Sequence, residues 1–196
     1  MKNFQVKLAT FTLTLILASC SKDDAPKPFP LPVNEEEVIT TVTAVYTPVG
    51  GGTNVTLRSR DLDGDGPNAP IVTVSAPFAL NKTYNGQVTI LNETTNPADD
   101  ITVEVQEEGV DHQLFYQKTG TLPAFGYATD TSNFDSNGKP IGLKTTFVTT
   151  TAATGSLSIT LRHLPNKSAA GVSGGDITNA GGATDFQVLF TGVSVQ

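Results

Sequence analysis

The residues best suited to bind a ligand form an acidic loop between two segments that have the pattern of strands. Asp61, Asp63 and Asp65 alternate with other residues in this loop, and Gly66 follows them. The spacing matches the first half of an EF-hand-like calcium loop, in which clustered carboxylate oxygens bind the ion and the glycine lets the backbone turn around it. Position 12 of such a loop is Val72 rather than a glutamate, so further ligands would have to come from elsewhere in the chain.

The alternative interpretation of the same loop is an acidic β-turn without a metal ion. Asp and Gly favour tight turns through their own conformational preferences, and Pro67 and Pro70 prevent a helix from following directly. The acidic stretch near Glu93 is a candidate source of further oxygen ligands. The sequence therefore supports two hypotheses, a calcium ion bound by the three aspartates or a metal-free turn.

Two other acidic patterns have simpler interpretations. Segment 133–138 repeats the acidic spacing with two Asp replaced by Asn, and its position 12 is Lys144, which opposes a cation. We therefore predict a plain Asn-Gly turn there. Seven acids lie between Glu93 and Asp111, and such a run is usually a solvated face rather than a pair of catalytic carboxylates.

Serine and histidine are weak candidates for catalysis or metal binding. Residues 171–175 spell Gly-x-Ser-x-Gly, but that nucleophile motif needs a helix after it and a His later in the chain. His112 and His163 both precede it, which indicates a chance match. Two histidines are too few by themselves for a metal site, and His163 ends an alternating segment, which predicts a packed or edge residue.

The composition excludes several classes of protein. The 196 residues contain 12 Lys and Arg against 19 Asp and Glu, a formal net charge of −7, which excludes a basic nucleic-acid-binding domain. A single Cys cannot form a disulfide scaffold or a cysteine-based zinc site. Trp, the usual residue for stacking on sugars, is absent. A chain of this length is expected to form one domain.

The N-terminus has the pattern of an export signal. Lys2 and Lys7 supply positive charge, and the apolar run at 8–17 is too short to span a membrane. The run leads into Leu-Ala-Ser-Cys, ending at Cys20, which resembles the lipobox of bacterial lipoproteins. The resemblance implies that residues 1–19 are a signal peptide and that Cys20 carries a thioether-linked lipid. The alternative is an ordinary signal peptide with a chance cysteine.

The residues after the predicted lipidation site resemble an export address. Lys22, Asp23 and Asp24 resemble the signal that sends lipoproteins of Bacteroidota to the outer face of the outer membrane. Residues 25–32 have Pro at every second position, which predicts a semi-rigid polyproline II spacer. We expect segment 20–37 to be a tether, and its charged residues are the address in one interpretation and merely solvated in the other.

From residue 38 onward, short apolar or alternating runs are separated by Gly, Pro, Asn or Asp, the pattern of strands and turns. This pattern favours an antiparallel sandwich or barrel. We predict one all-β domain over 38–196, an Ig-like or jelly-roll-like antiparallel β-sandwich of about eight or nine strands. The predicted strands are 38–47, 54–60, 71–75, 87–91, 114–116, 143–150, 157–162 and 185–195.

One segment could form a helix instead of a strand. Residues 97–108 follow Asn96, a residue type that caps helices, and begin with a proline, which suits the first helical position. Ile101, Val103 and Val105 alternate with polar residues, which is the strand period. We predict a short helix near 97–108 and keep the strand as the alternative.

Several motifs along the chain are shared with one group of bacterial proteins. Besides the Cys20 leader, they are VNEEE at 33–37, RDLDGDG at 60–66, LNET at 91–94, LRHLPNKS at 161–168 and GGDITNAGG at 174–182. The whole chain resembles uncharacterised lipoproteins of Bacteroidota, mainly from flavobacteria. Members are sometimes labelled as type 1 periplasmic-binding-fold proteins, a fold that alternates strands with long helices in two lobes. The resemblance implies no known function and no catalytic residues.

These observations predict a non-enzymatic, outer-membrane-anchored lipoprotein that acts as a surface binding or adhesion module. Its partners would be the membrane, through the N-terminal lipid, and a glycan or protein at the cell surface. Calcium at the acidic loop is the candidate cofactor, with the metal-free turn as the alternative. The alternative is a periplasm-facing ligand-binding or envelope-structural lipoprotein, and a third class, a glycan hydrolase, would need a cleft with two carboxylates.

Overall fold

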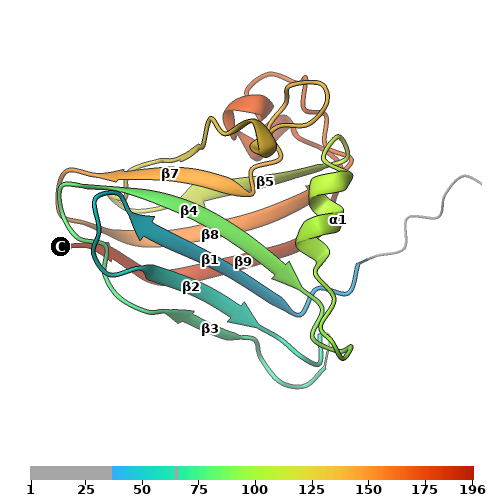
Figure 1. Ribbon diagram of the computed structural model, residues 1–196, viewed down its shortest axis with the longest axis horizontal. Coiled ribbons are helices and arrows are strands. Elements are labelled where there is room, and N and C mark those ends of the chain that lie inside the picture. Colours follow the sequence, from blue (N-terminus) through green and yellow to red (C-terminus); the bar gives the residue numbers. More distant parts are fainter. Residues whose placement is uncertain (1–36, 65) are drawn as a thin grey trace, which may run out of the picture. The chain divides into compact units, whose positions relative to one another are not determined.

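The computed structural model describes residues 37–64 and 66–196. Within these residues, nine strands form two antiparallel sheets, and one short α-helix lies at the end of the strands (Figure 1). No helix among the described residues is long and apolar enough to cross a membrane. The predicted sandwich therefore forms from the segment that follows the predicted tether.

The N-terminal features predicted from the sequence lie outside the described residues. These are the signal peptide at 1–19, the lipidation site Cys20, and the export residues Lys22, Asp23 and Asp24. Their roles stay predictions, and their tests do not depend on the fold described below.

The larger sheet is built from six strands. They are β1 (Thr41–Pro48), β2 (Val55–Arg60), β3 (Ile71–Val74), β4 (Lys82–Leu91), β6 (Phe125–Tyr127) and β7 (Lys144–Thr149). Their order across the sheet is β3-β2-β1-β4-β7-β6, and all neighbours are antiparallel. In β1, β2, β4 and β7, buried residues alternate with more exposed ones. Each of these strands therefore turns one face to the core and the other to solvent.

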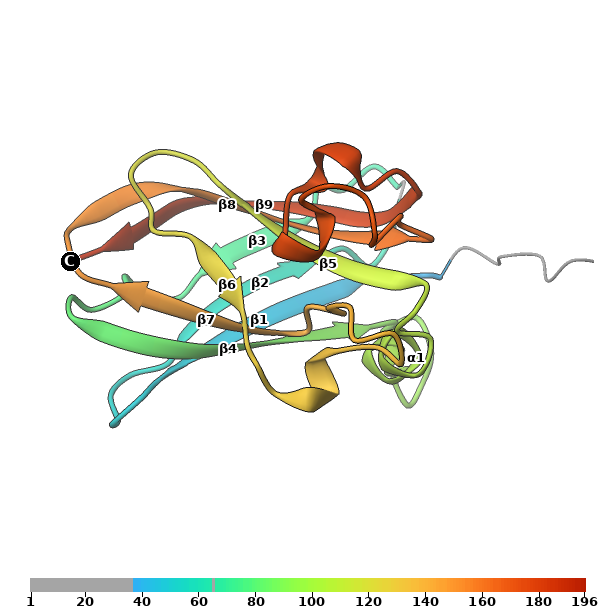
Figure 2. The same cartoon turned by 90° about the horizontal axis from the view of Figure 1, so that it is seen from above.

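The smaller sheet has three strands, β5 (His112–Lys118), β8 (Ala153–His163) and β9 (Ala183–Val195), in the order β5-β8-β9. Figure 2 shows β8 and β9 on one side of the molecule and β4 and β7 on the other. Phe78, in the loop before β4, makes a parallel bridge to the C-terminal end of β9. This bridge ties the loop between β3 and β4 to the end of β9.

Strand β9 contains a β-bulge near its start. Leu161 of β8 pairs with Phe186, whereas the next residue, Arg162, pairs with Thr184. Asp185 is therefore an extra residue that no position of β8 opposes. A bulge of this kind re-aims a side chain relative to the regular alternation of the strand.

The space between the sheets is filled by apolar side chains from both. The larger sheet and its loops contribute five aromatic rings, Tyr46, Phe78, Tyr84, Phe125 and Phe147. Phe125 and Phe147 are cross-strand partners whose rings stack with centroids 4.1 Å apart, and Phe78 meets Tyr46, Tyr84 and Phe147 edge to face. Such pairs add stabilisation to simple burial, so the sheets are held together mainly by this core.

A long loop covers the outer face of the smaller sheet at β5. Phe115 points outward from β5 and packs against Val172 and Ala180 of this loop. The buried ammonium of Lys167 donates to the carboxylate of Asp135 over 2.9 Å and to the backbone carbonyl of Gly109. Among the described residues, three short 3-10 helices lie in loops. They are η1 (Thr131–Asn133) between β6 and β7, and η2 (Val172–Gly174) and η3 (Ile177–Asn179) between β8 and β9.

The predicted helix is present as α1 (Ile101–Glu107), but it begins four residues later than expected. The side chain of Asp100 caps it by accepting a hydrogen bond from the backbone N–H of Thr102. Ile101 and Val105, four residues apart, are both buried, so the apolar residues follow the helical period. The hydroxyl of Thr102 also accepts a hydrogen bond from the backbone of β4, which fixes the helix at the end of that strand.

The predicted antiparallel β-sandwich is confirmed, and its nine strands agree with the expected eight or nine. Strand β6 was not predicted, because three residues are too few for a periodic pattern. The longest α-helix among the described residues has 7 residues. A type 1 periplasmic-binding fold, with its long helices, is therefore not the fold of residues 37–64 and 66–196.

The packing around Gly86 of β4 gives a test of the core. A Cβ atom at this position would lie 2.6 Å from the ring of Tyr46, and closer still to the hydroxyl of Thr145. We expect Gly86→Ala to lower the free energy of unfolding by about 1–3 kcal/mol through overpacking, measured by urea denaturation. The matched control is Gly126→Ala in β6, where the nearest atom is 3.8 Å away. Equal stability of the two variants would contradict the described packing.

Candidate functional site

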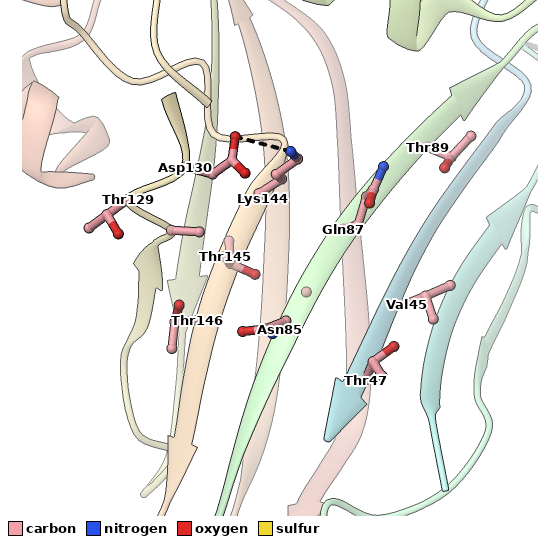
Figure 3. Close-up of a pocket in the computed structure, with 12 residues that line it drawn as sticks. Val45, Thr47, Asn85, Gln87, Thr89, Thr129, Asp130, Lys144, Thr145 and Thr146 are labelled. Atoms are coloured by element: carbon pink, nitrogen blue, oxygen red, sulfur yellow. Dashed lines mark ion pairs between the residues drawn. The ribbon is translucent and has the colours of Figure 1, made fainter. Parts of the chain in front are cut away.

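A polar groove lies on the outer face of the larger sheet (Figure 3). Its volume is about 600 Å³, within the range of about 300–1,000 Å³ found for ligand pockets. Its floor is formed by β1, β4 and β7, and the segment 128–130 after β6 flanks it. Seven neutral polar residues line it, of which Thr145 is buried. The other six define the polar groove: Thr47, Asn85, Gln87, Thr89, Thr129 and Thr146.

Strand register places these side chains next to one another. Thr47 is opposite Asn85, and Asn85 is opposite Thr146, so the three form a row across β1, β4 and β7. Gln87 and Lys144 face each other in the adjacent row. Directly opposed side chains on one face have Cβ atoms about 4.5–5.5 Å apart. The groove therefore presents a regular array of amide and hydroxyl groups.

The array is not used by the fold itself. None of the six polar side chains forms a hydrogen bond with residues 37–64 or 66–196. Each hydroxyl can donate and accept, and each amide supplies a carbonyl acceptor and an NH₂ donor. These groups are therefore free to exchange their bonds with water for bonds with a ligand.

The charged groups beside the groove compensate each other. The Lys144 ammonium lies 3.2 Å from a carboxylate oxygen of Asp130 (Figure 3). It also donates to the hydroxyl of Ser132 over 2.7 Å. Hydrogen bonds from Ser132 and Lys144 hold the pKa of Asp130 below its usual range. This end of the groove carries no net charge, which favours a neutral, hydroxyl-rich ligand over an ion.

The wall of the groove is fixed by a buried amide. The side chain NH₂ of Asn133 donates to the carbonyls of Ala128 and Lys144 over 3.0 and 2.8 Å, and its oxygen accepts from the backbone N–H of Lys144 over 2.8 Å. These bonds hold segment 128–130 beside β7. A wall that is already fixed lowers the entropic cost of binding a ligand.

The segment that follows Asn133 is the predicted turn. The carboxylate of Asp135 accepts hydrogen bonds from the backbone N–H groups of Asn137 and Lys139 over 2.8 and 2.9 Å. Its other oxygen accepts from the buried ammonium of Lys167. The Lys167 ammonium therefore pairs with the carboxylate that closes this turn.

The acidic loop after β2 is described at Asp61 and Asp63, whereas Asp65 lies outside the described residues. The carboxylate of Asp63 accepts hydrogen bonds from the side chain and the backbone N–H of Asn68 over 2.8 and 3.2 Å. These bonds lower the pKa of Asp63. Hydrogen bonds of this kind are expected for an acidic turn. Calcium binding by the three aspartates stays a prediction.

Glu93, considered as a source of further calcium ligands, is engaged elsewhere. Its carboxylate accepts hydrogen bonds from Arg60 over 2.5 and 2.9 Å, from Thr41 over 2.6 Å and from Arg58 over 3.3 Å. Hydrogen bonds from Arg60 and Thr41 lower its pKa to about 2. The side chain therefore fastens the loop after β4 to the outer face of β1 and β2.

The other sequence motifs serve the fold. Asp100 caps α1, and Glu104, Glu107 and Glu108 are exposed on the helix or at its end. In the Gly-x-Ser-x-Gly string, Ser173 begins no helix long enough for a nucleophile motif, and its hydroxyl donates to the carbonyl of Lys167 over 2.6 Å. That hydroxyl is therefore committed to a loop contact.

The two histidines meet in a cluster that sequence reasoning did not foresee. His112 begins β5, His163 ends β8, and the two are cross-strand partners. Nδ1 of His163 lies 3.0 Å from Nε2 of His112. The same Nε2 atom lies 3.7 Å from a carboxylate oxygen of Glu37 and 3.9 Å from one of Asp185.

Burial sets the electrostatics of this imidazole–carboxylate cluster, defined as Glu37, His112, His163 and Asp185. The side chain of His112 is 0% exposed, and those of Glu37 and Asp185 are 12% and 11% exposed. Burial lowers the pKa of His112. Burial, followed by repulsion from neighbouring carboxylates that include Asp185, raises the pKa of Glu37 to about 7.

Comparison with known proteins gives no indication of what this protein does. No protein-family model matches the chain, and no curated protein or solved structure matches it either. The membership in a group of Bacteroidota lipoproteins that the sequence motifs imply therefore stays a prediction.

Calcium binding at the acidic loop can be tested by melting. If Asp61, Asp63 and Asp65 bind Ca²⁺, a hundredfold excess over Kd stabilises the fold by about 2.7 kcal/mol. That gain corresponds to a rise in melting temperature of about 5–10 °C. Asp63→Asn combined with Asp65→Asn removes the response because two ligand charges are lost. Identical wild-type curves in Ca²⁺ and in EGTA would leave the loop as a metal-free turn.

Proposed function

We propose that this protein is a non-enzymatic, outer-membrane-anchored lipoprotein whose β-sandwich is a surface module that binds glycans. The polar groove is the proposed binding site. The ligand class is a neutral carbohydrate, because its hydroxyl groups match the donors and acceptors of the groove.

The observation that carries the proposal is the row of unengaged polar side chains. Thr47, Asn85 and Thr146 project from three adjacent strands into one groove, and they form no hydrogen bond within the described residues. A sheet face that is merely solvated does not require a groove with a fixed wall. Hydroxyl and amide groups on rigid strands provide directional hydrogen bonds for a polar ligand.

The charges favour binding over catalysis at this site. Lys144 and Asp130 are the charged side chains among the described residues that line the groove, and they pair with each other. A glycosidase needs two carboxylic groups on either side of the bond to be cleaved. The groove therefore offers recognition groups rather than an acid and a base.

The N-terminal sequence supports a location at the membrane. Cys20 follows the apolar run at the position that lipidation requires, and Lys22, Asp23 and Asp24 follow it. A chain that carries more than one lipid is anchored stably to a bilayer. The net negative charge of the protein would keep the domain away from an anionic membrane surface, where a glycan ligand could reach it.

The groove is tested on an array of neutral polysaccharides. We expect Asn85→Ala and Gln87→Ala each to weaken binding about 2- to 10-fold, because one net hydrogen bond contributes about 0.5–1.5 kcal/mol. The matched control is Gln187→Ala, an exposed strand glutamine on the smaller sheet. Binding that is lost in the control, or unchanged when both groove residues are replaced, would exclude the groove as the site.

The anchor and its address are tested by fractionation and by protease treatment of intact cells. Cys20→Ser should release the protein from the membrane fraction, because serine cannot form the thioether. Replacing Lys22, Asp23 and Asp24 with Ala should leave the protein in the membrane but protect it from external protease. Unchanged protease access in the triple variant would show that these residues are only a tether. Protection of the wild-type chain would favour the periplasm-facing alternative.

A further inference from the structure

We propose that Glu37, His112, His163 and Asp185 form a binding site for a divalent transition-metal ion, and that zinc fits it best. The cluster lies at the end of the sandwich where β5 begins and β8 ends, beside α1. It is separate from the polar groove, and none of its residues lines that groove.

The spacing of the donor atoms matches one ion. Two ligand atoms at about 2.1 Å from a tetrahedral zinc ion are about 3.4 Å apart. Measured from Nε2 of His112, the distances are 3.0 Å to His163, 3.7 Å to Glu37 and 3.9 Å to Asp185. The donor atoms of His112, His163 and Asp185 lie within 4.8 Å of one another, so three donors already surround one centre. A side-chain movement of Glu37, which lies beside the same Nε2 atom of His112, would add the fourth.

The donor types select the metal. Two imidazoles and two carboxylates suit zinc and similar transition metals, whereas Ca²⁺ and Mg²⁺ prefer oxygen ligands alone. The single Cys of the chain is Cys20, so no thiolate takes part in this set. The combination differs from the all-oxygen acidic loop and should not share its preference for calcium.

The carboxylates around the cluster carry negative charge that a bound cation would neutralise. The carboxylates of Glu37 and Asp185 are nearly buried, and each lies within 4 Å of Nε2 of His112. Glu108 at the end of α1 is close to Glu37. One carboxylate oxygen of Glu37 is buried and has no hydrogen-bond partner among the described residues. An unpartnered buried carboxylate oxygen is costly, and a dication would satisfy it.

The orientation of His112 is already that of a metal ligand. Its Nδ1 atom lies 3.2 Å from the backbone carbonyl of Glu108. In the tautomer in which Nδ1–H donates to this carbonyl, the lone pair of Nε2 points to the cluster. Metal-binding histidines usually have their second nitrogen fixed by such a bond.

A filled site would join separate parts of the fold. Asp185 is the extra residue of the bulge in β9, whereas His112 begins β5 and His163 ends β8 of the same sheet. Glu37 lies just before β1 of the larger sheet. Four protein ligands complete a tetrahedral shell, which is typical of a structural zinc site. The ion would therefore link the two sheets where the predicted tether meets the domain.

The test uses the untagged full chain with Cys20→Ser, stripped with EDTA and titrated with ZnCl₂ by calorimetry, with bound zinc counted by elemental analysis. We expect one zinc per chain and a melting temperature raised by about 5–10 °C at a hundredfold excess over Kd. Because His112 is fully buried, its replacement could unfold the chain. The near-isosteric double variant Glu37→Gln with Asp185→Asn is used instead, and its fold is checked by circular dichroism.

The double variant should bind zinc at least tenfold more weakly, since even outer-shell changes weaken metal sites 10- to 100-fold. Glu107→Gln, on the exposed face of α1, and Asp63→Asn, in the acidic loop, are matched controls that should bind zinc like the wild type. The proposal is overturned if the wild type takes up no zinc at micromolar concentration, or if the folded double variant binds as tightly as the wild type.

Discussion

The structure depends on the burial of two sheet faces against each other. Because side chains alternate along a strand, every residue that packs into the aromatic and aliphatic core commits its neighbours to the outside. In β4, the buried Tyr84 and Val88 leave Asn85, Gln87 and Thr89 on the outer face. The same alternation on β1 and β7 brings further threonines beside them, so the polar groove is the reverse side of the core.

The imidazole–carboxylate cluster arises from the same constraint at the end of the core. His112 continues the inward row of Leu114 on β5, and His163 continues that of Leu161 on β8. Apolar side chains at these positions would have extended the core by one layer. Instead, ionisable groups are buried there, and buried polar groups are stable only when they are paired or bind a metal. Hydrophobic packing therefore does not explain this cluster.

Sequence patterns predicted the fold where the information was local. Alternation in segments such as 157–162 identified strands, and capping residues identified a helix, although its cap is Asp100 rather than Asn96. Features that depend on pairing between distant segments were not predictable. The bulge at Asp185 follows from the register of β9 against β8, and the meeting of His112 with His163 follows from that of β5 against β8. The groove likewise needs the order of β1, β4 and β7 in the sheet.

The most direct test of the central claim, that the outer face of β1, β4 and β7 is the recognition surface, is nuclear magnetic resonance mapping. The ¹⁵N-labelled Cys20→Ser chain would be titrated with the neutral polysaccharide fragment that binds best on the array. We predict that the largest shifts come from the side-chain amides of Asn85 and Gln87 and from the backbone of segment 128–130, while β5, β8 and β9 stay unchanged. Shifts confined to the smaller sheet or to the acidic loop would contradict the account.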